Sequence, residues 1–249
     1  MPNQFKSAIV IPSYNETLAL PKLLSELSKF LDSHDILVVV DDSPKEISDH
    51  LKQSCLTSLA NSPCHLIFIQ NEEKKGRGAA VRKGMLNLLT LYPNLQYVLE
   101  CDADGSHTVP DIVSILRHNT NSDLLVGSRY VNGSKIEGWP LNRRIFSWIL
   151  NKSIPKIVGI PINDITNGLR RYTRKAVVEI LENPQQNQGF IYLTEQAILV
   201  DRAGLCITEV PITFVDRSLG VSTVTWKEIF RSLKGVLSLI MDGMSKHKC

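Results

Sequence analysis

Residues 8–44 read AIVIPSYNETLALPKLLSELSKFLDSHDILVVVDDSP, and this stretch decides the fold. Ala8–Ile11 is an uninterrupted apolar run, which is typical of a strand buried on both faces of a parallel sheet. Leu18–Leu31 has the apolar spacing of an amphipathic helix, and Asp35–Val40 reads as a second buried strand. The stretch therefore predicts a strand, a helix and a second strand of the same sheet.

The alternation of strands and helices continues beyond this stretch. Further elements are predicted at Cys55–Ala60 (the end of a helix), His65–Gln70 (strand), Ala79–Leu91 (helix), Gln96–Glu100 (strand) and Leu124–Ser128 (strand). Strands that alternate with helices predict an α/β protein, because helices that connect parallel strands cover the faces of the sheet. We therefore expect a Rossmann-like, mostly parallel sheet flanked by helices.

Two more elements are predicted nearer the C-terminus. Arg143–Val158 reads as a basic amphipathic helix that is interrupted at Pro155, because proline lacks the backbone N–H that a helix interior requires. Leu205–Phe214 reads as a strand, with Pro211 at a sheet edge or in a bulge.

The domain organisation is expected to be simple. No internal repeat, low-complexity segment or linker divides the chain, so we expect one domain over residues 1–225. Apolar residues between Trp226 and Ile240 recur near helical spacing with basic residues among them, which predicts a C-terminal amphipathic helix and tail over residues 226–249. Such a helix lies either at a membrane surface or against the core of its own domain.

Charge and cysteine content exclude several classes of protein. The 249-residue chain carries 28 basic and 25 acidic side chains, a net charge of +3, and lacks the strongly basic balance of a nucleic-acid-binding protein. Its five cysteines are odd in number and lack the paired spacing of a zinc site, so we expect reduced thiols in the cytoplasm. We expect no secretory leader, and no run reaches the roughly 20 apolar residues that a membrane crossing requires.

Polar clusters follow three of the predicted strands. Pro12–Glu16 follows the first strand, Asp41–Pro44 follows the second, and Asp102–Asp104 follows the strand that ends at Glu100. Because ligands of open α/β sheets bind beyond the carboxyl ends of the strands, we expect these three segments to meet at one edge and form the functional site.

Asp102 and Asp104 form the strongest candidate for a metal site. In an extended segment, residues two positions apart point to the same side, so both carboxylates can reach one cation. Hard oxygen ligands favour Mg²⁺ or Mn²⁺, which commonly keep positions for substrate phosphates. Ser106 can add an oxygen, whereas His107 is expected to be structural or to support a metal ligand rather than to bind the metal itself. The alternative is that the aspartates cap a helix or form a turn.

The segments after the first two strands are candidates for nucleotide binding. A carboxylate of Asp41 or Asp42 can accept hydrogen bonds from a nucleobase N–H or from ribose hydroxyl groups. Tyr14 offers a stacking surface and Glu16 a further acceptor. A turn is an equally good interpretation of the two aspartates, and Tyr14 could simply pack over its loop.

The segment Asn71–Ala79 combines basic side chains with glycines just before a predicted helix. Glycines permit close backbone approach, and the N-terminus of a helix favours anions, so this segment is a candidate phosphate-binding loop with Arg77 as a nucleotide-binding side chain. Its spacing matches neither a P-loop nor a Rossmann fingerprint. Taken alone, this segment would be interpreted as a run of charged residues that are exposed to solvent.

Together, these motifs resemble family 2 glycosyltransferases. The segments that carry the resemblance are residues 11–16 (IPSYNE), 40–44 (VDDSP), 76–79 (GRGA), 102–104 (DAD) and 127–130 (GSRY). Further segments resemble the dolichol-phosphate mannosyltransferase branch: Gly138-Trp139, Arg143 with Ser147, residues 164–170 (DITNGLR), residues 214–217 (FVDR), and Gly220 with Ser222. The resemblance extends from residue 8 to about residue 240.

The resemblance implies a GT-A fold and assigns roles to individual residues. It implies that Pro12, Tyr14, Glu16, Asp41 and Asp42 bind the nucleoside. It further implies that Asp102 and Asp104, with Ser106, hold the metal ion on the diphosphate. The same resemblance implies that Arg129, Arg143, Ser147 and Arg217 bind the acceptor phosphate or the donor diphosphate, so that Asp102, Asp104, Arg129 and Arg217 form the catalytic set.

The expected activity is a metal-dependent, inverting transfer of a hexose from a nucleotide sugar to a polyprenyl (dolichyl) phosphate. GDP-mannose is the favoured donor and UDP-glucose is next. The enzyme is expected to work in the cytoplasm, peripheral to the membrane, either on the membrane surface or beside a membrane-anchoring partner. One alternative is a soluble or polymeric acceptor with a hydroxyl nucleophile, for which Glu195 is the candidate base. The other alternative is an inactive nucleotide-binding scaffold.

Overall fold

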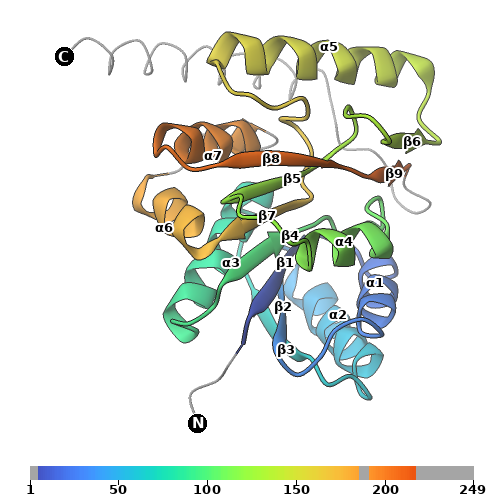
Figure 1. The fold of residues 1–249 in the computed structure, drawn as a ribbon. Coiled ribbons are helices and arrows are strands. Elements are labelled where there is room, and N and C mark those ends of the chain that lie inside the picture. Colours follow the sequence, from blue (N-terminus) through green and yellow to red (C-terminus); the bar gives the residue numbers. More distant parts are fainter. Residues whose placement is uncertain (1–4, 185–190, 217–249) are drawn as a thin grey trace.

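The computed structural model describes residues 5–184 and 191–216 (Figure 1). The strands are β1 (Ser7–Ser13), β2 (Asp35–Asp41), β3 (His65–Gln70), β4 (Tyr97–Glu100), β5 (Leu124–Ser128), β6 (Lys135–Glu137), β7 (Arg170–Thr173), β8 (Ile207–Pro211) and β9 (Thr213–Val215). The helices are α1 (Ala19–Leu27), α2 (Lys45–Ser58), α3 (Arg77–Leu91), α4 (Val109–Leu116), α5 (Leu141–Val158), α6 (Arg174–Glu182) and α7 (Ile191–Arg202).

A mixed but mostly parallel sheet forms the centre of the protein. Among the described residues, its strand order is β3-β2-β1-β4-β7-β5-β8, and β6 and β9 form a separate parallel pair. β1 pairs in parallel with both β2 and β4, and β5 pairs in parallel with β8. The antiparallel strand β7 lies between β4 and β5. The expected α/β class is confirmed, while the antiparallel insertion was not predicted.

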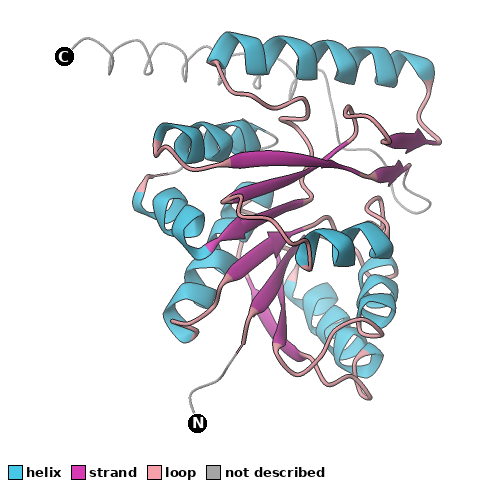
Figure 2. Cartoon of the chain, viewed as in Figure 1, coloured by secondary structure: helices cyan, strands magenta, loops and turns pink. Residues whose placement is uncertain are grey.

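Helices cover both faces of this sheet (Figures 1 and 2). Alternate residues of β1 pack in two separate hydrophobic clusters: Ala8 and Val10 lie in one, and Ile9 and Ile11 lie in the other. This division follows from the pleat of a strand, which sends successive side chains to opposite faces. On one face, Gly84 of α3 lets the helix lie close to β1, because a Cβ there would stand 2.6 Å from a methyl carbon of Val10.

Several predicted elements differ from the observed ones. Helix α5 runs through Pro155 without the expected interruption, because Pro155 lies in the last turn and the helix ends at Gly159, in the left-handed conformation with φ 76°. The single strand predicted for Leu205–Phe214 is divided at Ile212, since β8 pairs with β5 whereas β9 pairs with β6. Pro211 ends β8, which is an edge strand of the sheet, as expected.

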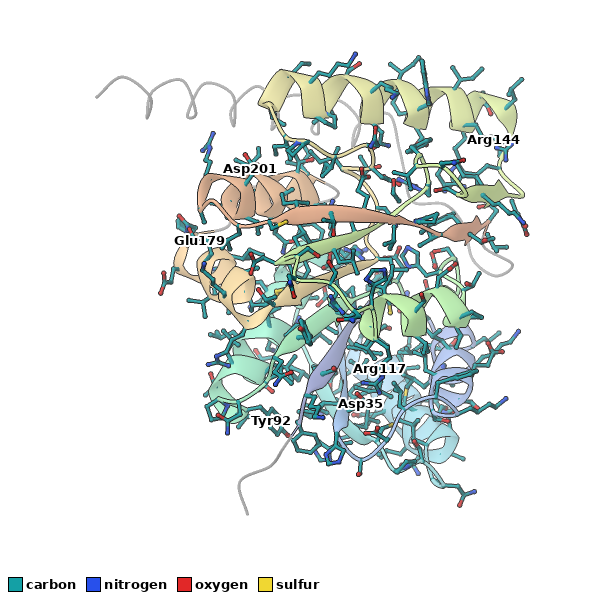
Figure 3. The ribbon with its side chains drawn as sticks, in the orientation of Figure 1. Asp35, Tyr92, Arg117, Arg144, Glu179 and Asp201 are labelled. Carbon is teal, nitrogen blue, oxygen red and sulfur yellow. The ribbon has the colours of Figure 1, made fainter. Side chains whose placement is uncertain are left out.

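An ion pair lies at the amino end of the sheet, which is the end opposite the polar clusters. Asp35 begins β2 and is almost completely buried, and its carboxylate pairs with the guanidinium of Arg117, which follows α4 (Figure 3). The backbone N–H of Asp32 also donates to Asp35. A buried carboxylate needs such partners, and both of these bonds are made to Oδ2, whereas the buried Oδ1 has no hydrogen-bond partner among the described residues.

In the described segments, none of the helices combines the length and the hydropathy that crossing a bilayer would need. The C-terminal amphipathic helix and tail predicted for residues 226–249 lie outside the described residues, as does the proposed boundary at residue 225.

The described cysteines are free thiols with contrasting environments. Cys55, Cys64 and Cys101 are buried, whereas Cys206 is exposed. Burial, reinforced by the nearby charge of Asp41, raises the pKa of the Cys55 thiol to about 12. Since the thiolate is the reactive species, Cys55 stays protonated and unreactive at pH 8.

Alkylation of the folded protein should therefore be selective among these four cysteines. We expect iodoacetamide at pH 8 to modify Cys206, and to modify the three buried thiols only after denaturation, as read by peptide mass spectrometry. Modification of Cys55 in the native protein at the rate of Cys206 would contradict the packing described above.

Candidate active site

The three polar segments meet at the carboxyl edge of neighbouring strands. β1 lies between β2 and β4, so the residues that follow these strands are adjacent. Backbone and side-chain hydrogen bonds join the first two segments: Asp42 N–H donates to the Ser13 carbonyl at 2.9 Å, and Asn15 N–H donates to Ser43 Oγ at 2.7 Å. The convergence predicted from the sequence is therefore present.

Asp41 and Ser13 each carry a buried polar atom without a hydrogen-bond partner at this edge. Ser43 Oγ donates to Asp41 Oδ1 at 2.8 Å, but the buried Asp41 Oδ2 and Ser13 Oγ have no hydrogen-bond partner among the described residues. Leaving a buried carboxylate oxygen unpaired costs free energy unless a ligand supplies the missing donor. The neighbouring Tyr14 ring is 40% exposed, and Lys74 Nζ lies 3.6 Å from its centroid.

Pro12 and Glu16, the other residues expected to bind the nucleoside, flank this group. Pro12 belongs to β1 and is buried beside Val40 of β2, where it shapes the strand end. Glu16 lies in the loop before α1, and its carbonyl accepts the N–H of Leu20. Their contact with a nucleoside stays a prediction.

Asp42 organises the basic loop. One of its carboxylate oxygens accepts from Asn71 Nδ2 at 2.6 Å, and the other accepts from the backbone N–H groups of Lys75 and Gly76 at 3.0 and 2.8 Å. Gly76 has φ 86°, a conformation that favours glycine, and immediately precedes α3. The loop therefore enters a helix as predicted, and Asp42 holds its backbone in place.

Arg77, the first residue of α3, reaches the metal-site candidate Asp102. Its Nε and Nη2 lie 2.8 and 2.7 Å from Asp102 Oδ1, and its Nη1 lies 3.8 Å from Glu100 Oε2. Burial opposes the charge of Arg77, but the carboxylates of Asp102 and Glu100 outweigh burial and raise its pKa above the usual value. Arg77 was expected at the nucleotide, and the structure places its guanidinium on these carboxylates.

Glu100 is the buried support of this arginine. It is completely buried, and its two carboxylate oxygens accept from the hydroxyl groups of Tyr172 and Tyr192 at 3.2 and 3.1 Å. Burial raises the pKa of Glu100, while Arg77 acts in the opposite direction. In the sequence Glu100 reads only as the end of a strand, because nothing local marks its tyrosine partners.

The segment from Asp102 to Ser106 is a turn rather than the extended segment that was expected. Asp104 Oδ1 accepts the backbone N–H of Ser106 at 3.0 Å, which closes this turn. His107 is buried and bonds at both ring nitrogens, with the Asp102 N–H at 3.3 Å and with Asn167 Oδ1 at 3.0 Å. His107 thus holds the backbone at Asp102 in place, and the turn rather than strand alternation positions the two aspartates.

Asp102, Asp104 and Ser106 fit a hard divalent cation. Ser106 Oγ is buried and has no hydrogen-bond partner among the described residues, so an oxygen ligand is open beside the carboxylate of Asp104. Within residues 5–184 and 191–216, no group of three or more His, Cys, Asp or Glu side chains is arranged to hold a metal ion. Substrate phosphate oxygens would have to complete the coordination of Mg²⁺ or Mn²⁺ here.

Arg129 and Asp164 form a buried ion pair next to this edge. Arg129 Nε and Nη2 donate to the two carboxylate oxygens of Asp164, each at 2.8 Å, and the backbone N–H of Arg129 donates to Asp164 as well. Burial opposes the charge of Arg129, but Asp164 outweighs burial and raises the pKa of Arg129. Nη1 makes no hydrogen bond to another described residue, so it is available to a ligand.

Trp139 joins Arg129 to the acceptor-phosphate candidates on α5. The guanidinium of Arg143 lies 4.1 Å from the Trp139 ring and that of Arg129 lies 5.2 Å from it. Ser147 Oγ accepts from the Tyr130 hydroxyl at 2.7 Å. Arg143 also donates to Asp216 at 2.8 Å. The structure thus gathers Arg129, Arg143 and Ser147, while Arg217 lies outside the described residues.

Two members of this group carried no assigned role in the sequence. Trp139 and Asp164 stand in segments that were singled out only for their resemblance to a family. The indole Nε1 of Trp139 is buried and has no hydrogen-bond partner among the described residues. Glu195, the candidate base for a hydroxyl acceptor, lines a small cavity between α3, α6 and α7 with Arg82 and Tyr192.

Comparison with known proteins identifies the chain's family. Residues 8–181, which include every polar segment of the edge described above, match glycosyl transferase family 2. The chain belongs to this family. As a member of glycosyl transferase family 2, it is a glycosyltransferase, as the sequence motifs predicted.

Relatives with similar sequences extend over most of the chain. An undecaprenyl-phosphate mannosyltransferase of Micrococcus luteus is 33% identical over 217 residues, which cover 87% of this chain and 86% of the relative. A polyprenol monophosphomannose synthase of Mycolicibacterium smegmatis is 31% identical over 228 residues, which cover 90% of this chain and 83% of the relative. The resemblance predicted from the motifs is confirmed.

Solved structures of other glycosyltransferases share the fold. A glucosyl-3-phosphoglycerate synthase of Mycobacterium tuberculosis, solved with Mn²⁺ and uridine diphosphate, superposes with a TM-score of 0.63 at 17% identity, covering 95% of this chain and 79% of that one. A mannosyltransferase of Pyrobaculum calidifontis, solved with GDP-Man and Mn²⁺, gives 0.60 at 14% identity, covering 95% and 64%. The GT-A fold is confirmed.

Proposed function

We propose that this glycosyltransferase moves mannose from GDP-mannose to a polyprenyl phosphate, with inversion at the anomeric carbon. The observation that carries the proposal is the placement of two groups side by side: an acidic edge that suits a nucleotide sugar, and the arginines around Trp139 that suit a second phosphate. The names of the two relatives at 31–33% identity support a polyprenyl-phosphate acceptor and mannose as the sugar.

The donor half of the site binds the nucleotide sugar. Asp41 Oδ2 and Ser13 Oγ accept from and donate to the nucleoside, because both atoms are buried with no partner among the described residues. Asp102, Asp104 and Ser106 would hold Mg²⁺ or Mn²⁺, which supplies positive charge to the leaving diphosphate. The two relatives of known structure that were solved with Mn²⁺ support the use of a divalent cation.

The acceptor half positions an anionic nucleophile. Arg129 Nη1 and Arg143 bind the acceptor phosphate, since guanidinium groups make strong charge-assisted bonds to phosphate oxygens. A phosphate oxygen attacks the anomeric carbon from the face opposite the diphosphate; the new C–O bond forms as the bond to the diphosphate oxygen breaks. The attacking phosphate is already ionised at neutral pH, so the reaction requires no protein base.

Helix α5 supports a membrane location for this reaction. Leu141, Ile145, Trp148, Ile149 and Ile157 are between 47% and 71% exposed on this one helix, and Arg144, Lys152 and Lys156 are exposed among them. In Figure 3 side chains of α5 project away from the body of the protein. Apolar and basic side chains together fit the surface of an anionic bilayer, and the same helix carries Arg143 and Ser147.

Substitution of the apolar surface of α5 should weaken membrane binding. We expect Ile145→Ser combined with Trp148→Ser to reduce the fraction that sediments with anionic phospholipid vesicles by about tenfold, because two partly inserted apolar side chains are lost. Leu86→Ser is the matched control, since Leu86 is 57% exposed on α3 and belongs to neither half of the site. Equal sedimentation of the double variant and the wild type would contradict a role for α5.

A donor comparison tests the proposed reaction. Purified protein with Mn²⁺ and one short polyprenyl phosphate is incubated with GDP-mannose, UDP-glucose or UDP-N-acetylglucosamine, and lipid-linked sugar is followed by mass spectrometry. We expect product with GDP-mannose, and its anomeric configuration by NMR should be opposite to that of the donor. Product with UDP-glucose alone would replace mannose by glucose in the proposal.

A further inference from the structure

We propose that Arg77 pairs with the carboxylate of Asp102 when no nucleotide is bound, and so competes with a divalent cation for this carboxylate. Binding of the cation then depends on a bound nucleoside diphosphate. The inference builds on the proposed use of Asp102 as a cation ligand. It adds that the positively charged guanidinium of Arg77 competes with the divalent cation for Asp102.

The contact between the two side chains is concentrated on one oxygen atom. Arg77 Nε and Nη2 both lie within 2.8 Å of Asp102 Oδ1. The Asp102 side chain is only 26% exposed and that of Arg77 18%, so solvent screens their attraction weakly. A divalent cation that approaches Asp102 therefore meets a carboxylate whose charge is already balanced by a neighbouring positive group.

The surroundings of Arg77 hold it in this position. Glu100 lies behind the guanidinium, the Tyr192 ring lies 5.4 Å from its central carbon, and the Gly168 carbonyl accepts from Nη2 at 3.4 Å. Gly168 also leaves the space that the guanidinium fills, because a Cβ at this position would stand 2.2 Å from Nη2. A side chain larger than glycine at this position would therefore force the Arg77 guanidinium to shift.

The same guanidinium is not fully satisfied. Its Nη1 is buried and makes no hydrogen bond within the described residues, since Glu100 is 3.8 Å away. Arg77 also begins α3, whose first N–H groups favour an anion. A diphosphate at this end of α3 offers Arg77 oxygen partners that suit its planar donors better than one shared carboxylate oxygen. Movement of Arg77 toward the diphosphate exposes Asp102 to the cation.

The predicted consequence is a thermodynamic coupling. If a nucleoside diphosphate draws Arg77 away from Asp102, the nucleotide strengthens cation binding, and the cation strengthens nucleotide binding by the same factor. Part of any such coupling comes from direct contact between cation and phosphate. The part that belongs to Arg77 is the part that disappears when Arg77 is replaced.

The test measures Mn²⁺ binding without sugar or lipid, by electron paramagnetic resonance of the free ion. We expect Arg77→Met to tighten Mn²⁺ binding by the nucleotide-free protein about tenfold, and GDP to add less further affinity than it adds in the wild type. We expect Gly168→Ala to tighten Mn²⁺ binding in the same direction, since it displaces the guanidinium without changing the net charge. Lys52→Met, at an exposed position on α2 outside the site, controls for loss of charge and should change the affinity less than twofold.

Three results would overturn the inference: Mn²⁺ affinity that is unchanged or weaker in both Arg77→Met and Gly168→Ala, an equal gain in Lys52→Met, or micromolar Mn²⁺ binding by the nucleotide-free wild type. If Arg77→Met does not fold, as judged by circular dichroism, Gly168→Ala and the wild-type measurement decide. Asp102→Asn separates this inference from the proposed function. Mn²⁺ binding that survives Asp102→Asn shows that the cation site itself is misplaced, whereas failure of mannosyl transfer leaves the binding result intact.

Discussion

Asp104→Asn should lower kcat/KM for sugar transfer by about 10³-fold while the protein stays folded. The substitution keeps an acceptor for the Ser106 N–H, which closes the turn at 3.0 Å, but removes the negative charge. In the proposed mechanism, loss of this charged cation ligand withdraws stabilisation from the leaving diphosphate, and a 10³-fold effect corresponds to about 4 kcal/mol. Initial rates with saturating and limiting GDP-mannose give the value.

The control for this experiment is Asp49→Asn. Asp49 is exposed on α2, so its substitution removes the same charge outside the site and should leave kcat/KM within twofold of the wild-type value. A wild-type rate for Asp104→Asn at limiting Mn²⁺ would show that the turn between Asp102 and Ser106 has no part in catalysis.

Asp164→Ala should lower the free energy of unfolding by about 3–5 kcal/mol, the largest effect on stability that we predict. The carboxylate of Asp164 is completely buried and accepts three hydrogen bonds from Arg129. Without it, the Arg129 guanidinium is left as a buried charge that no longer has its ion-pair partner. Urea denaturation followed by circular dichroism measures the change.

A second arginine–aspartate pair provides the comparison. Arg143 and Asp216 are joined at 2.8 Å, but both side chains are about one third exposed, so water replaces part of the lost interaction. We expect Asp216→Ala to cost at most about 1 kcal/mol. If Asp164→Ala and Asp216→Ala lowered the free energy of unfolding equally, burial would not determine how much each ion pair contributes to stability.

The parallel strands could be predicted from the sequence because most of them are marked by a local run of apolar residues. Apolar runs such as Ala8–Ile11 and His65–Gln70 read directly as strands, and β3 begins and ends at the predicted residues. β7 was missed because Arg170 and Arg171 interrupt any apolar pattern. Their buried guanidinium groups donate to main-chain carbonyls, including those of Leu193 and His118, which are distant in the sequence.

The candidate site was predictable to the extent that strand order brings its segments together. The edge that contains Asp41, Asp102 and Asp104 followed from the positions of these residues after parallel strands. The pairing of Arg129 with Asp164 spans 35 residues, and that of Arg77 with Asp102 spans 25, so no local pattern marks either pair. Such partners become visible only when the chain is folded.

These two unpredicted pairs also give the site its internal organisation. Asp164 fixes the orientation of Arg129 and leaves Nη1 without a hydrogen bond to any described residue, while Asp102 holds Arg77 at the start of α3. Both arginines are held by carboxylates at the edge where a diphosphate and an acceptor phosphate would bind. The protein therefore keeps its positive charges positioned and compensated before substrate arrives.

The acceptor comparison is the most direct test of the central claim. Protein, GDP-mannose and Mn²⁺ are incubated in parallel with a short polyprenyl phosphate, the corresponding polyprenol and free mannose, and mannosylated product is quantified by mass spectrometry. The account predicts mannosylated polyprenyl phosphate and no product from the other two acceptors, because Arg129 and Arg143 require a phosphate. Equal mannosylation of polyprenol, or product from free mannose alone, would contradict it.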